Sequence, residues 1–279
     1  MTRAAGPVPR AVILAAGRGS RLAGVAGDCP KCLVRLGGAT LLERQIVALR
    51  ACGVEAITVV TGYQAARVAK ACGASAATLE NARYAETNSL YSLWLARDLL
   101  SDGFVVLNAD VLFHLQLLRD LLSSRVEDAL LVEFRDQHVE AFGDEEMKVR
   151  VRGGRVADIA KTLPADQADG ENVGIARFGA AGARLLLAEM DAIVAEGGLR
   201  EWAPRAFQRF ARTRPLHVIG TRGFPWIEID FPEDYARAAQ DVLPLIEAIG
   251  DAFPAPGHVP RALAMDYQEA EWRPQPGHV

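Results

Sequence analysis

The sequence predicts an α/β protein with a mostly parallel central sheet that is covered by helices on both faces. From residue 11 onward, short aliphatic and β-branched runs alternate with stretches that have helical spacing. The chain has 279 residues and is 50% hydrophobic, which is enough for one sizeable core. Two of the aliphatic runs end in a glycine turn at Gly17 and in Asp110, as expected at the carboxyl edge of a parallel sheet.

The first half of the chain has the clearest alternation of strands and helices. AVILAAG has the composition of a buried strand, and Gly53 is a natural stop for the helix before it. Strands that alternate with helices require right-handed crossovers, which place parallel strands side by side. The elements predicted here are a strand over 11–17, a helix over 40–53, a strand over 56–63, a helix over 63–73, a helix over about 87–100 and a strand over 103–110.

The second half of the chain changes character. Residues 147–161 alternate around Gly153-Gly154, which predicts a β-hairpin. WIEID is followed by Phe-Pro, so a strand, an acid and a proline turn are expected before a long final helix. The elements predicted here are a strand over 128–134, the hairpin over 147–161, helices over 181–197 and about 199–211, an apolar run over 216–220 and a strand followed by a helix within 226–249.

Residues 1–250 are interpreted as one domain, and the Pro-rich residues 251–279 as a tail that forms a loose arm or a subunit contact, so that a homodimer is possible. The net charge of −4 argues against a nucleic-acid partner. No run of about 18 apolar residues occurs, so no membrane partner is expected. The apolar run at 11–17 is short and continues directly into the glycine turn, so we interpret it as a strand rather than a signal peptide and expect a cytoplasmic protein.

The four cysteines include a CPKC motif formed by Cys29 and Cys32. Such a motif could be a redox pair or half of a zinc site. A structural zinc ion needs four ligands, and no second CxxC or CxxH follows. Free thiols are therefore the preferred interpretation.

The glycine turn GRGSRL admits three interpretations. A dinucleotide fingerprint needs a third glycine, where Leu22 stands, and an acid about 20 residues further on, which is missing. A P-loop needs Gly-Lys followed by Ser or Thr, which is also absent. The third interpretation is a turn whose backbone N–H groups approach a triphosphate while Arg18, Arg21 and Lys31 neutralise it.

The sequence around this turn resembles the nucleotidyltransferases that make nucleoside-diphosphate sugars and alcohols. Their signature LAAGxGxRL, followed by a loop and PKxL, is matched by LAAGRGSRL (14–22), AGVAGDC and PKCL (30–33). NARYAETNSLYSLWLA (81–96) and LNADVLF (107–113) resemble segments of the choline-phosphate and related cytidylyltransferases, and WIEIDFPEDY (226–235) follows in the family's order. The resemblance implies a Rossmann-like three-layer α/β/α nucleotidyltransferase fold with a mixed, mostly parallel sheet and an inserted β-hairpin.

The implied reaction is attack by a phosphate or phosphonate oxygen on the α-phosphorus of a nucleoside triphosphate, with release of pyrophosphate. Mg²⁺ suits this reaction because it prefers oxygen ligands and bridges phosphates. Asp110 and Asp230 end two apolar strands and are the expected metal ligands, with Glu228 on the same strand face as Asp230. Taken singly, Asp110 could instead cap a helix, and Asp230 could be a turn residue.

Further residues are assigned to the substrates. Lys31 is expected at the transferred phosphate and Arg21 at the triphosphate tail, so Lys31, Arg21, Asp110 and Asp230 are the catalytic candidates. By the resemblance, Lys161 contacts a phosphate, although it could be a solvated lysine that ends a hairpin strand. The nucleotide-binding candidates are Leu14, Ala15, Ala16, Gly17, Arg18, Gly19, Lys31, Asn81, Thr87, Asn88, Ser89 and Asn108; of these, the polar side chains from Thr87 to Ser89 could read a base or cap a helix. The acceptor-binding candidates are Tyr84, Glu145, Lys161, Glu171, Trp226 and Glu228, with Trp226 as a core residue in the alternative.

The preferred function is Mg²⁺-dependent transfer of CMP from CTP to a small phosphorylated or phosphonate alcohol such as phosphocholine or 2-aminoethylphosphonate. The acids and aromatics near the expected acceptor site favour an acceptor with a cationic amine. The alternative enzyme is a sugar-1-phosphate nucleotidyltransferase that uses UTP, dTTP or GTP. A catalytically inactive nucleotide-sensing or scaffold subunit is a different class, and the presence of Arg21, Lys31, Asp110 and Asp230 argues against it.

Overall fold

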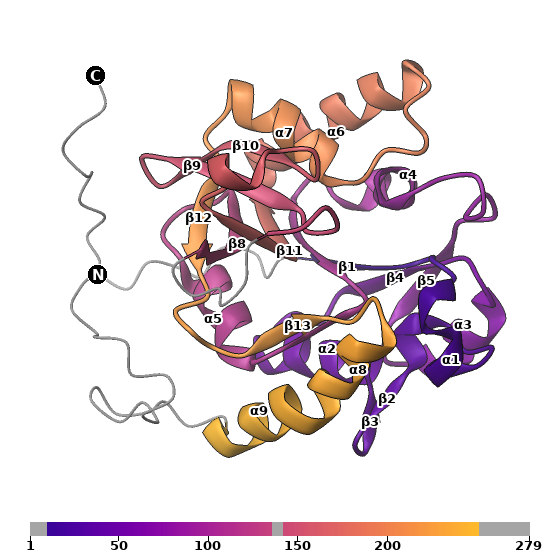
Figure 1. Ribbon diagram of the computed structural model, residues 1–279. Helices are drawn as coiled ribbons and strands as arrows, with labels where there is room; N and C mark the ends of the chain where they lie inside the picture. Colours follow the sequence, from indigo (N-terminus) through magenta and orange to yellow (C-terminus); the bar gives the residue numbers. More distant parts are fainter. Residues whose placement is uncertain (1–9, 136–141, 251–279) are drawn as a thin grey trace.

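The computed structural model of the protein describes residues 10–135 and 142–250. These residues form three layers, in which helices cover both faces of a nine-stranded mixed sheet (Figure 1). The predicted α/β class is therefore confirmed. The sheet has the order β5-β4-β1-β6-β11-β8-β12-β10-β9. Its strands are β1 (Arg10–Ala15), β4 (Ile57–Thr61), β5 (Ala77–Glu80), β6 (Gly103–Asn108), β8 (Ala129–Phe134), β9 (Lys148–Arg152), β10 (Arg155–Ala160), β11 (Gly170–Gly179) and β12 (His217–Gly220).

The two halves of the sheet differ in strand direction. Strands β5, β4, β1 and β6 are parallel to one another, as the alternation of strands and helices predicts. Strand β11 then runs antiparallel to both β6 and β8. The hairpin β9–β10 turns at Gly153-Gly154, as predicted, and continues the sheet through β12. The sheet is therefore mixed, as expected, but it is not mostly parallel: its second half contains the antiparallel pairs, and these are at least as numerous as the parallel ones.

Each face of the sheet has its own hydrophobic core. Side chains of successive residues in a strand point to opposite faces, so Ile13 and Val12 of β1 belong to different cores. One core contains Leu49, Val68 and Leu117 and lies against the helices α2 (Leu41–Ala51), α3 (Ala65–Cys72) and α5 (Leu115–Ser123). The other core contains Leu93 and Phe207 and lies against the helices α4 (Ser89–Leu95), α6 (Ala180–Ala195) and α7 (Pro204–Thr213).

Local sequence signals account for the ends of several helices. Helix α2 begins with a capping box in which the Thr40 side chain accepts from the Glu43 backbone and the Glu43 carboxylate accepts from the Thr40 backbone. Gly53 has a φ of +78°, which suits the predicted stop. Helix α7 begins later than predicted, with Pro204 in its first turn, and residues 199–203 before it form a loop.

A smaller unit packs below the sheet in Figure 1. Strand β13 (Trp226–Glu228) pairs antiparallel with β7 (Val111–Phe113), a strand that the sequence did not predict. The expected final helix is divided into α8 (Pro232–Arg237), a π-helical turn and α9 (Leu243–Ile249). Within the described residues, every helix is too short or too polar to traverse a lipid bilayer. The predicted Pro-rich tail, 251–279, lies outside the described residues.

Candidate active site

A pocket of about 320 Å³ lies at the carboxyl ends of β1 and β6. This is the edge at which the sequence predicts a ligand site. The glycine turn, the start of α4 and the end of β6 line one part of it, whereas the loop before β9, the end of β10, the loop before α7 and the end of β13 line the rest. The pocket therefore collects side chains from most of the described chain.

The glycine turn brings Lys31 into this pocket. Gly19 has a φ of +66°, a conformation that favours glycine. A Cβ atom on Gly19 would lie 2.7 Å from the Cβ of Lys31, so a larger residue would displace the lysine. Gly17 also lines the pocket, and a methyl group on its Cα would meet no atom within 4 Å, which leaves its backbone open to a ligand. Gly17 thus leaves space for a ligand to approach the backbone, and Gly19 leaves space for the Lys31 side chain.

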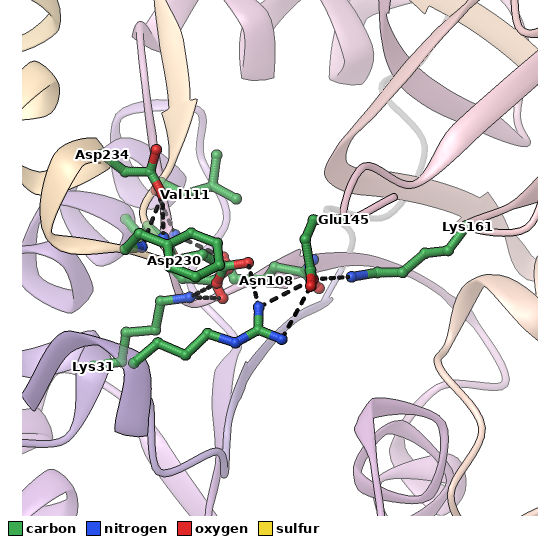
Figure 2. Close-up of polar contacts among 11 residues, drawn as sticks. Lys31, Asn108, Val111, Glu145, Lys161, Asp230 and Asp234 are labelled. Atoms are coloured by element: carbon green, nitrogen blue, oxygen red, sulfur yellow. Dashed lines mark hydrogen bonds and ion pairs between the residues drawn. The ribbon is translucent and has the colours of Figure 1, made fainter. Parts of the chain in front are cut away.

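Lys31 lies between two carboxylates (Figure 2). Its Nζ donates to Asp110 Oδ2 at 2.7 Å and also to Asp230 Oδ1. The Lys31 side chain is only 13% exposed. Burial by itself lowers the pKa of Lys31, but the charges of Asp110 and Asp230 outweigh it and hold the pKa above its usual value. Lys31 is therefore a charged group that is held at the base of the pocket.

The β7–β13 pair brings the two aspartates together although they are far apart in sequence. Glu228 is paired with Val111, and the Ile229 amide donates to the Asp110 carbonyl at 3.0 Å. The helix-cap alternative for Asp110 is wrong, because the N-cap of α5 is His114. At the other strand end, Asp234 accepts from the backbone amides of Asp230 and Phe231, which orders the turn after β13.

A buried glutamine holds the turn that carries Asp110. Gln45 of α2 is 1% exposed, and its side-chain nitrogen donates to the Asn108 carbonyl at 2.9 Å and to the Val111 carbonyl at 2.8 Å. These two bonds fix the backbone on both sides of Asp110. Sequence reasoning missed Gln45, because the glutamine lies within a helical pattern and carries no motif.

The acids Asp110, Glu228 and Asp230 form a cluster that could hold a metal ion. Their ligand atoms all lie within 4.8 Å of one another. Asp110 Oδ1 is buried and finds no hydrogen-bond partner among the described residues, so it is available as a ligand. Burial, followed by the charges of Asp110 and Asp230, raises the pKa of Glu228 well above its usual value. A cluster of carboxylate oxygens with excess negative charge fits a hard cation such as Mg²⁺.

Glu145 connects two cations across the pocket (Figure 2). The Arg21 guanidinium donates to both carboxylate oxygens of Glu145, at 3.0 and 3.2 Å. Lys161 Nζ donates to Glu145 Oε2 at 3.2 Å from the other side. The hydrogen bonds from Arg21, followed by that from Lys161, lower the pKa of Glu145. Lys161 directly follows the hairpin strand β10, as its alternative held, and it also lines the pocket and contacts Glu145; its contact with a phosphate stays a prediction.

The small polar residues before α4 make local hydrogen bonds at the edge of the pocket. Asn88 caps the helix by accepting from the Ser89 amide at 2.8 Å. Ser89 Oγ accepts from the Ala203 amide, and Thr87 Oγ1 donates to the Arg83 carbonyl. Thr87, Asn88 and Ser89 all line the pocket, and Asn88 caps the helix; a role of these side chains in reading a base stays a prediction.

Four predicted site residues do not line the pocket, whereas all the others do. Arg18 instead lies over the Tyr63 ring at 5.3 Å. Asn81 is 1% exposed, and its amide donates to the Thr87 and Ser92 hydroxyls beneath the pocket wall. Glu171 is buried within β11. Trp226 packs against the core, which was the alternative interpretation of this residue. The residues that do line it are Leu14, Ala15, Ala16, Gly17, Gly19, Arg21, Lys31, Tyr84, Thr87, Asn88, Ser89, Asn108, Asp110, Glu145, Lys161, Glu228 and Asp230.

The aromatic residue beside the acceptor candidates is Trp202, which sequence reasoning missed. It lines the pocket, is 47% exposed, and has Lys161 Nζ 5.0 Å from its ring centroid. Trp202 lies in the loop before α7, within a stretch that the sequence predicted as helix. The sequence signal that was available is a tryptophan two residues before Pro204, a proline that can begin a helix.

Comparisons with known proteins place the sequence in a family. The family model described as "MobA-like NTP transferase domain" matches residues 11–210. A Rubrobacter xylanophilus protein named bifunctional IPC transferase and DIPP synthase is 33% identical over 244 residues, which are 84% of this chain and 52% of the relative. The choline-phosphate cytidylyltransferase of Haemophilus influenzae is 37% identical over 105 residues, which are 37% of this chain and 45% of the relative.

A solved structure has the same fold. The inositol-1-phosphate CTP transferase from T. maritima superposes with a TM-score of 0.69 at 24% identity and covers 90% of this chain and 99% of its own. The present chain spans about half the length of the curated relatives that it matches over most of its own length. The family match covers the glycine turn, Lys31, Asp110, Glu145 and Lys161. The chain has the nucleotidyltransferase fold and belongs to the MobA-like NTP transferase family.

Proposed function

We propose that this chain transfers CMP from CTP to a small phosphorylated or phosphonate alcohol and releases pyrophosphate. The observation that carries the proposal is the position of Lys31 between Asp110 and Asp230, with Glu228 beside these acids, at the base of a pocket lined by the glycine turn. Two polyanions must approach each other in this reaction, so catalysis consists mainly of positioning and charge neutralisation. Relatives named cytidylyltransferases support CTP as the donor.

The acid cluster, Lys31 and Arg21 each have a defined role in this proposal. Asp110 and Asp230, with Glu228 beside them, would hold Mg²⁺. The bound ion supplies positive charge to the substrate phosphates. Lys31 exchanges its aspartate partners for the phosphate being transferred, and Arg21 takes the outer phosphates of the triphosphate. The backbone of the glycine turn lies along the same wall and orients the phosphate chain.

The other wall of the pocket suits an acceptor that carries a cationic amine. Glu145 offers a carboxylate, and the exposed ring of Trp202 already has a cation, Lys161, 5.0 Å from its centroid. A cation over an aromatic ring gains about 0.5–2 kcal/mol. Phosphocholine and 2-aminoethylphosphonate are the corresponding acceptors.

An inositol phosphate is the second candidate acceptor. The relative that aligns with 84% of this chain is named an IPC transferase, and a structural neighbour is an inositol-1-phosphate CTP transferase. A ring of hydroxyls could donate to Glu145, and it could also bond to Asn172, which lines the same pocket.

Pyrophosphate release tests these assignments. The protein with Mg²⁺ is assayed with CTP, UTP, dTTP and GTP against phosphocholine, 2-aminoethylphosphonate, inositol phosphate and glucose-1-phosphate. We expect the highest kcat/KM with CTP and an amine acceptor. A higher value for inositol phosphate with CTP would select the second acceptor, and a higher value for glucose-1-phosphate with UTP, dTTP or GTP would reject the cytidylyltransferase proposal.

A further inference from the structure

The contact between Arg21 and Glu145 is unusual because both residues line the pocket in which charged substrates would bind. Glu145 comes from the loop before β9, and Arg21 belongs to the 3₁₀ turn that follows the glycine turn. They are 124 residues apart and form a two-pronged ion pair. The Glu145 carboxylate therefore occupies a place that an oxygen pair of a phosphate group would fit, because a guanidinium binds both anions with the same paired geometry.

Both cations that contact Glu145 have a second support. The Arg21 guanidinium lies 5.0 Å from the centroid of the Phe231 ring, and its Nη1 is 4.0 Å from Asp230 Oδ2. Lys161 lies over the Trp202 ring. These contacts do not involve Glu145. If the Glu145 carboxylate moved away, Arg21 and Lys161 would keep a position that faces the pocket.

The ion pair is also weak enough to be exchanged. The side chains of Arg21 and Glu145 are 48% and 50% exposed. Exposed ion pairs of this kind contribute little to stability, because water screens them and two long side chains must be ordered. A polyphosphate carries several negative charges where Glu145 carries one. A triphosphate can therefore displace Glu145 from Arg21 at little cost.

We infer that Glu145 is an exchangeable internal anion that couples the two substrate sites. In the free enzyme it occupies Arg21. When the triphosphate binds Arg21, the Glu145 carboxylate leaves the guanidinium but keeps its bond from Lys161 to Oε2, so Oε1 becomes available, beside Trp202, to the positively charged group of the acceptor. This inference rests on the proposed function for the identity of the substrates, and it makes Glu145 a positioning residue for the acceptor.

The exchange has a thermodynamic consequence. Because the triphosphate frees the group that binds the acceptor, each substrate should raise the affinity for the other by the same factor. Glu145 should also oppose triphosphate binding and favour acceptor binding. A residue with a purely structural role would affect both substrates in the same direction.

The first experiment measures anion binding without any turnover. Inorganic tripolyphosphate with Mg²⁺ is titrated into the wild-type protein and Glu145→Gln by calorimetry. We expect about three- to tenfold tighter binding by Glu145→Gln, because its amide competes poorly for Arg21. Asp144→Asn is the matched control: Asp144 is the exposed neighbouring acid in the same loop and does not line the pocket, so its neutralisation should leave the affinity within about twofold.

Unchanged or weaker tripolyphosphate binding by Glu145→Gln would overturn the inference. An equal gain in Asp144→Asn would also overturn it, since any nearby negative charge would then have the same effect. Tripolyphosphate has no base, so this result does not depend on whether CTP is the donor. A failure of the proposed function would show instead as absent CTP turnover in the wild-type protein.

The second experiment measures the coupling. Binding of 2-aminoethylphosphonate is titrated with and without Mg²⁺ and a non-reactive CTP analogue. We expect the nucleotide analogue to raise the affinity of the wild-type protein for the acceptor about three- to tenfold. In Glu145→Gln we expect a weaker affinity for the acceptor, and one that the analogue leaves unchanged. Absence of coupling in the wild-type protein, or its persistence in Glu145→Gln, would contradict the exchange.

Discussion

Lys31 holds a positive charge between two acids at the point where the proposed reaction places more negative charge. The Gly19 position explains why this is possible, because a Cβ there would lie 2.7 Å from that of Lys31. The sequence predicted that Lys31 and the glycine turn belong together. It did not predict that Asp110 and Asp230 share the Lys31 ammonium, because this depends on the β7–β13 pair.

Replacement of Asp110 or Asp230 by alanine tests the acid cluster. We expect kcat for pyrophosphate release at saturating Mg²⁺ to fall at least about 100-fold in either variant, while circular dichroism stays native, because each acid would supply charge to the same ion. Asp98→Ala removes an acid whose side chain is 86% exposed and serves as the control. Near-normal turnover in either cluster variant would reject the metal assignment.

Lys31→Met separates binding from transfer. We expect kcat to fall about 10²- to 10³-fold with a smaller change in the KM for CTP, since the ammonium would neutralise charge that grows during transfer. The substitution also leaves Asp110 and Asp230 without their counter-ion. The Tm in EDTA should therefore drop, and added Mg²⁺ should raise it more than in the wild-type protein. Normal turnover with weakened CTP binding would mean that Lys31 only tethers the nucleotide.

At the scale of elements, hydrophobic periodicity predicted the strands and helices whose formation depends mainly on local sequence. The buried strands β1, β4, β6 and β8, and helix α2 with its capping box, lie within a few residues of their predicted positions. Strand β7 was missed because three residues are too few to show a period. In place of the single helix predicted over about 87–100, the chain forms α4 and then a separate 3₁₀ turn. Thr87 and Asn88 precede α4 and form the edge of the pocket.

The two tryptophans illustrate a limit of pattern reasoning. Trp226 lies beside the acids of WIEID in sequence, yet β13 directs it to the core. Trp202 has no such neighbours and lines the pocket. Proximity in sequence to a catalytic acid is therefore a poor guide: Trp226 is two residues from Glu228 and shares its strand face, yet it packs against the core and does not line the pocket.

Alanine replacements of these two tryptophans should therefore have different effects. Trp202→Ala should raise the KM for an amine acceptor about 2- to 30-fold, which corresponds to about 0.5–2 kcal/mol, with little change in Tm. Trp226→Ala should lower the free energy of unfolding by about 0.5–3 kcal/mol, because the partly buried ring loses its packing against the core. Steady-state kinetics and thermal denaturation on both variants make the comparison. An acceptor KM that rises only in Trp226→Ala would move the cation site away from Trp202.

The CPKC segment places one partly exposed thiol, Cys29, and one buried thiol, Cys32, on either side of Lys31. Burial raises the pKa of the Cys32 thiol to about 12, and the neighbouring Cys72 and Cys29 add to this effect. Since the thiolate is the nucleophilic form, the Cys32 thiol is a poor nucleophile in the native protein. The described cysteines are free, as the sequence predicted.

Iodoacetamide labelling tests this difference. In the native protein at pH 8, we expect Cys29, which is partly exposed, to react first, and Cys32 and Cys72, each 2% exposed, to react only after denaturation. Mass spectrometry of peptides at successive times gives the order. Labelling of Cys32 as fast as Cys29 would show that the segment opens readily in solution.

At the scale of the whole molecule, the pocket joins parts of the chain that no local pattern connects. Lys31 contacts Asp230 across 199 residues, and Arg21 contacts Glu145 across 124. The sequence motifs predicted most of the pocket residues because each motif lies at a strand end or in a loop. Their pairing as Lys31 with the acids and Arg21 with Glu145 follows from the order of strands in the sheet, which the motifs do not encode.

Because both halves of the chain line the pocket, a ligand that binds there should stabilise the fold as one unit. A ligand at 100 times its Kd adds about 2.7 kcal/mol to the free energy of unfolding. For a chain of this size that corresponds to a rise in Tm of about 5–10 °C. We expect this shift with CTP and Mg²⁺, and a smaller one with UTP, dTTP or GTP at the same concentration.

Scanning fluorimetry with each nucleotide, in Mg²⁺ and in EDTA, measures these shifts. EDTA should remove most of the CTP effect, since the acid cluster repels the triphosphate when no cation is bound. The double variant Asp110→Ala, Asp230→Ala should bind CTP with the same affinity in Mg²⁺ as in EDTA, because it has lost both the cation site and the repulsion. Equal shifts for all four nucleotides would mean that the pocket recognises the triphosphate without selecting the base.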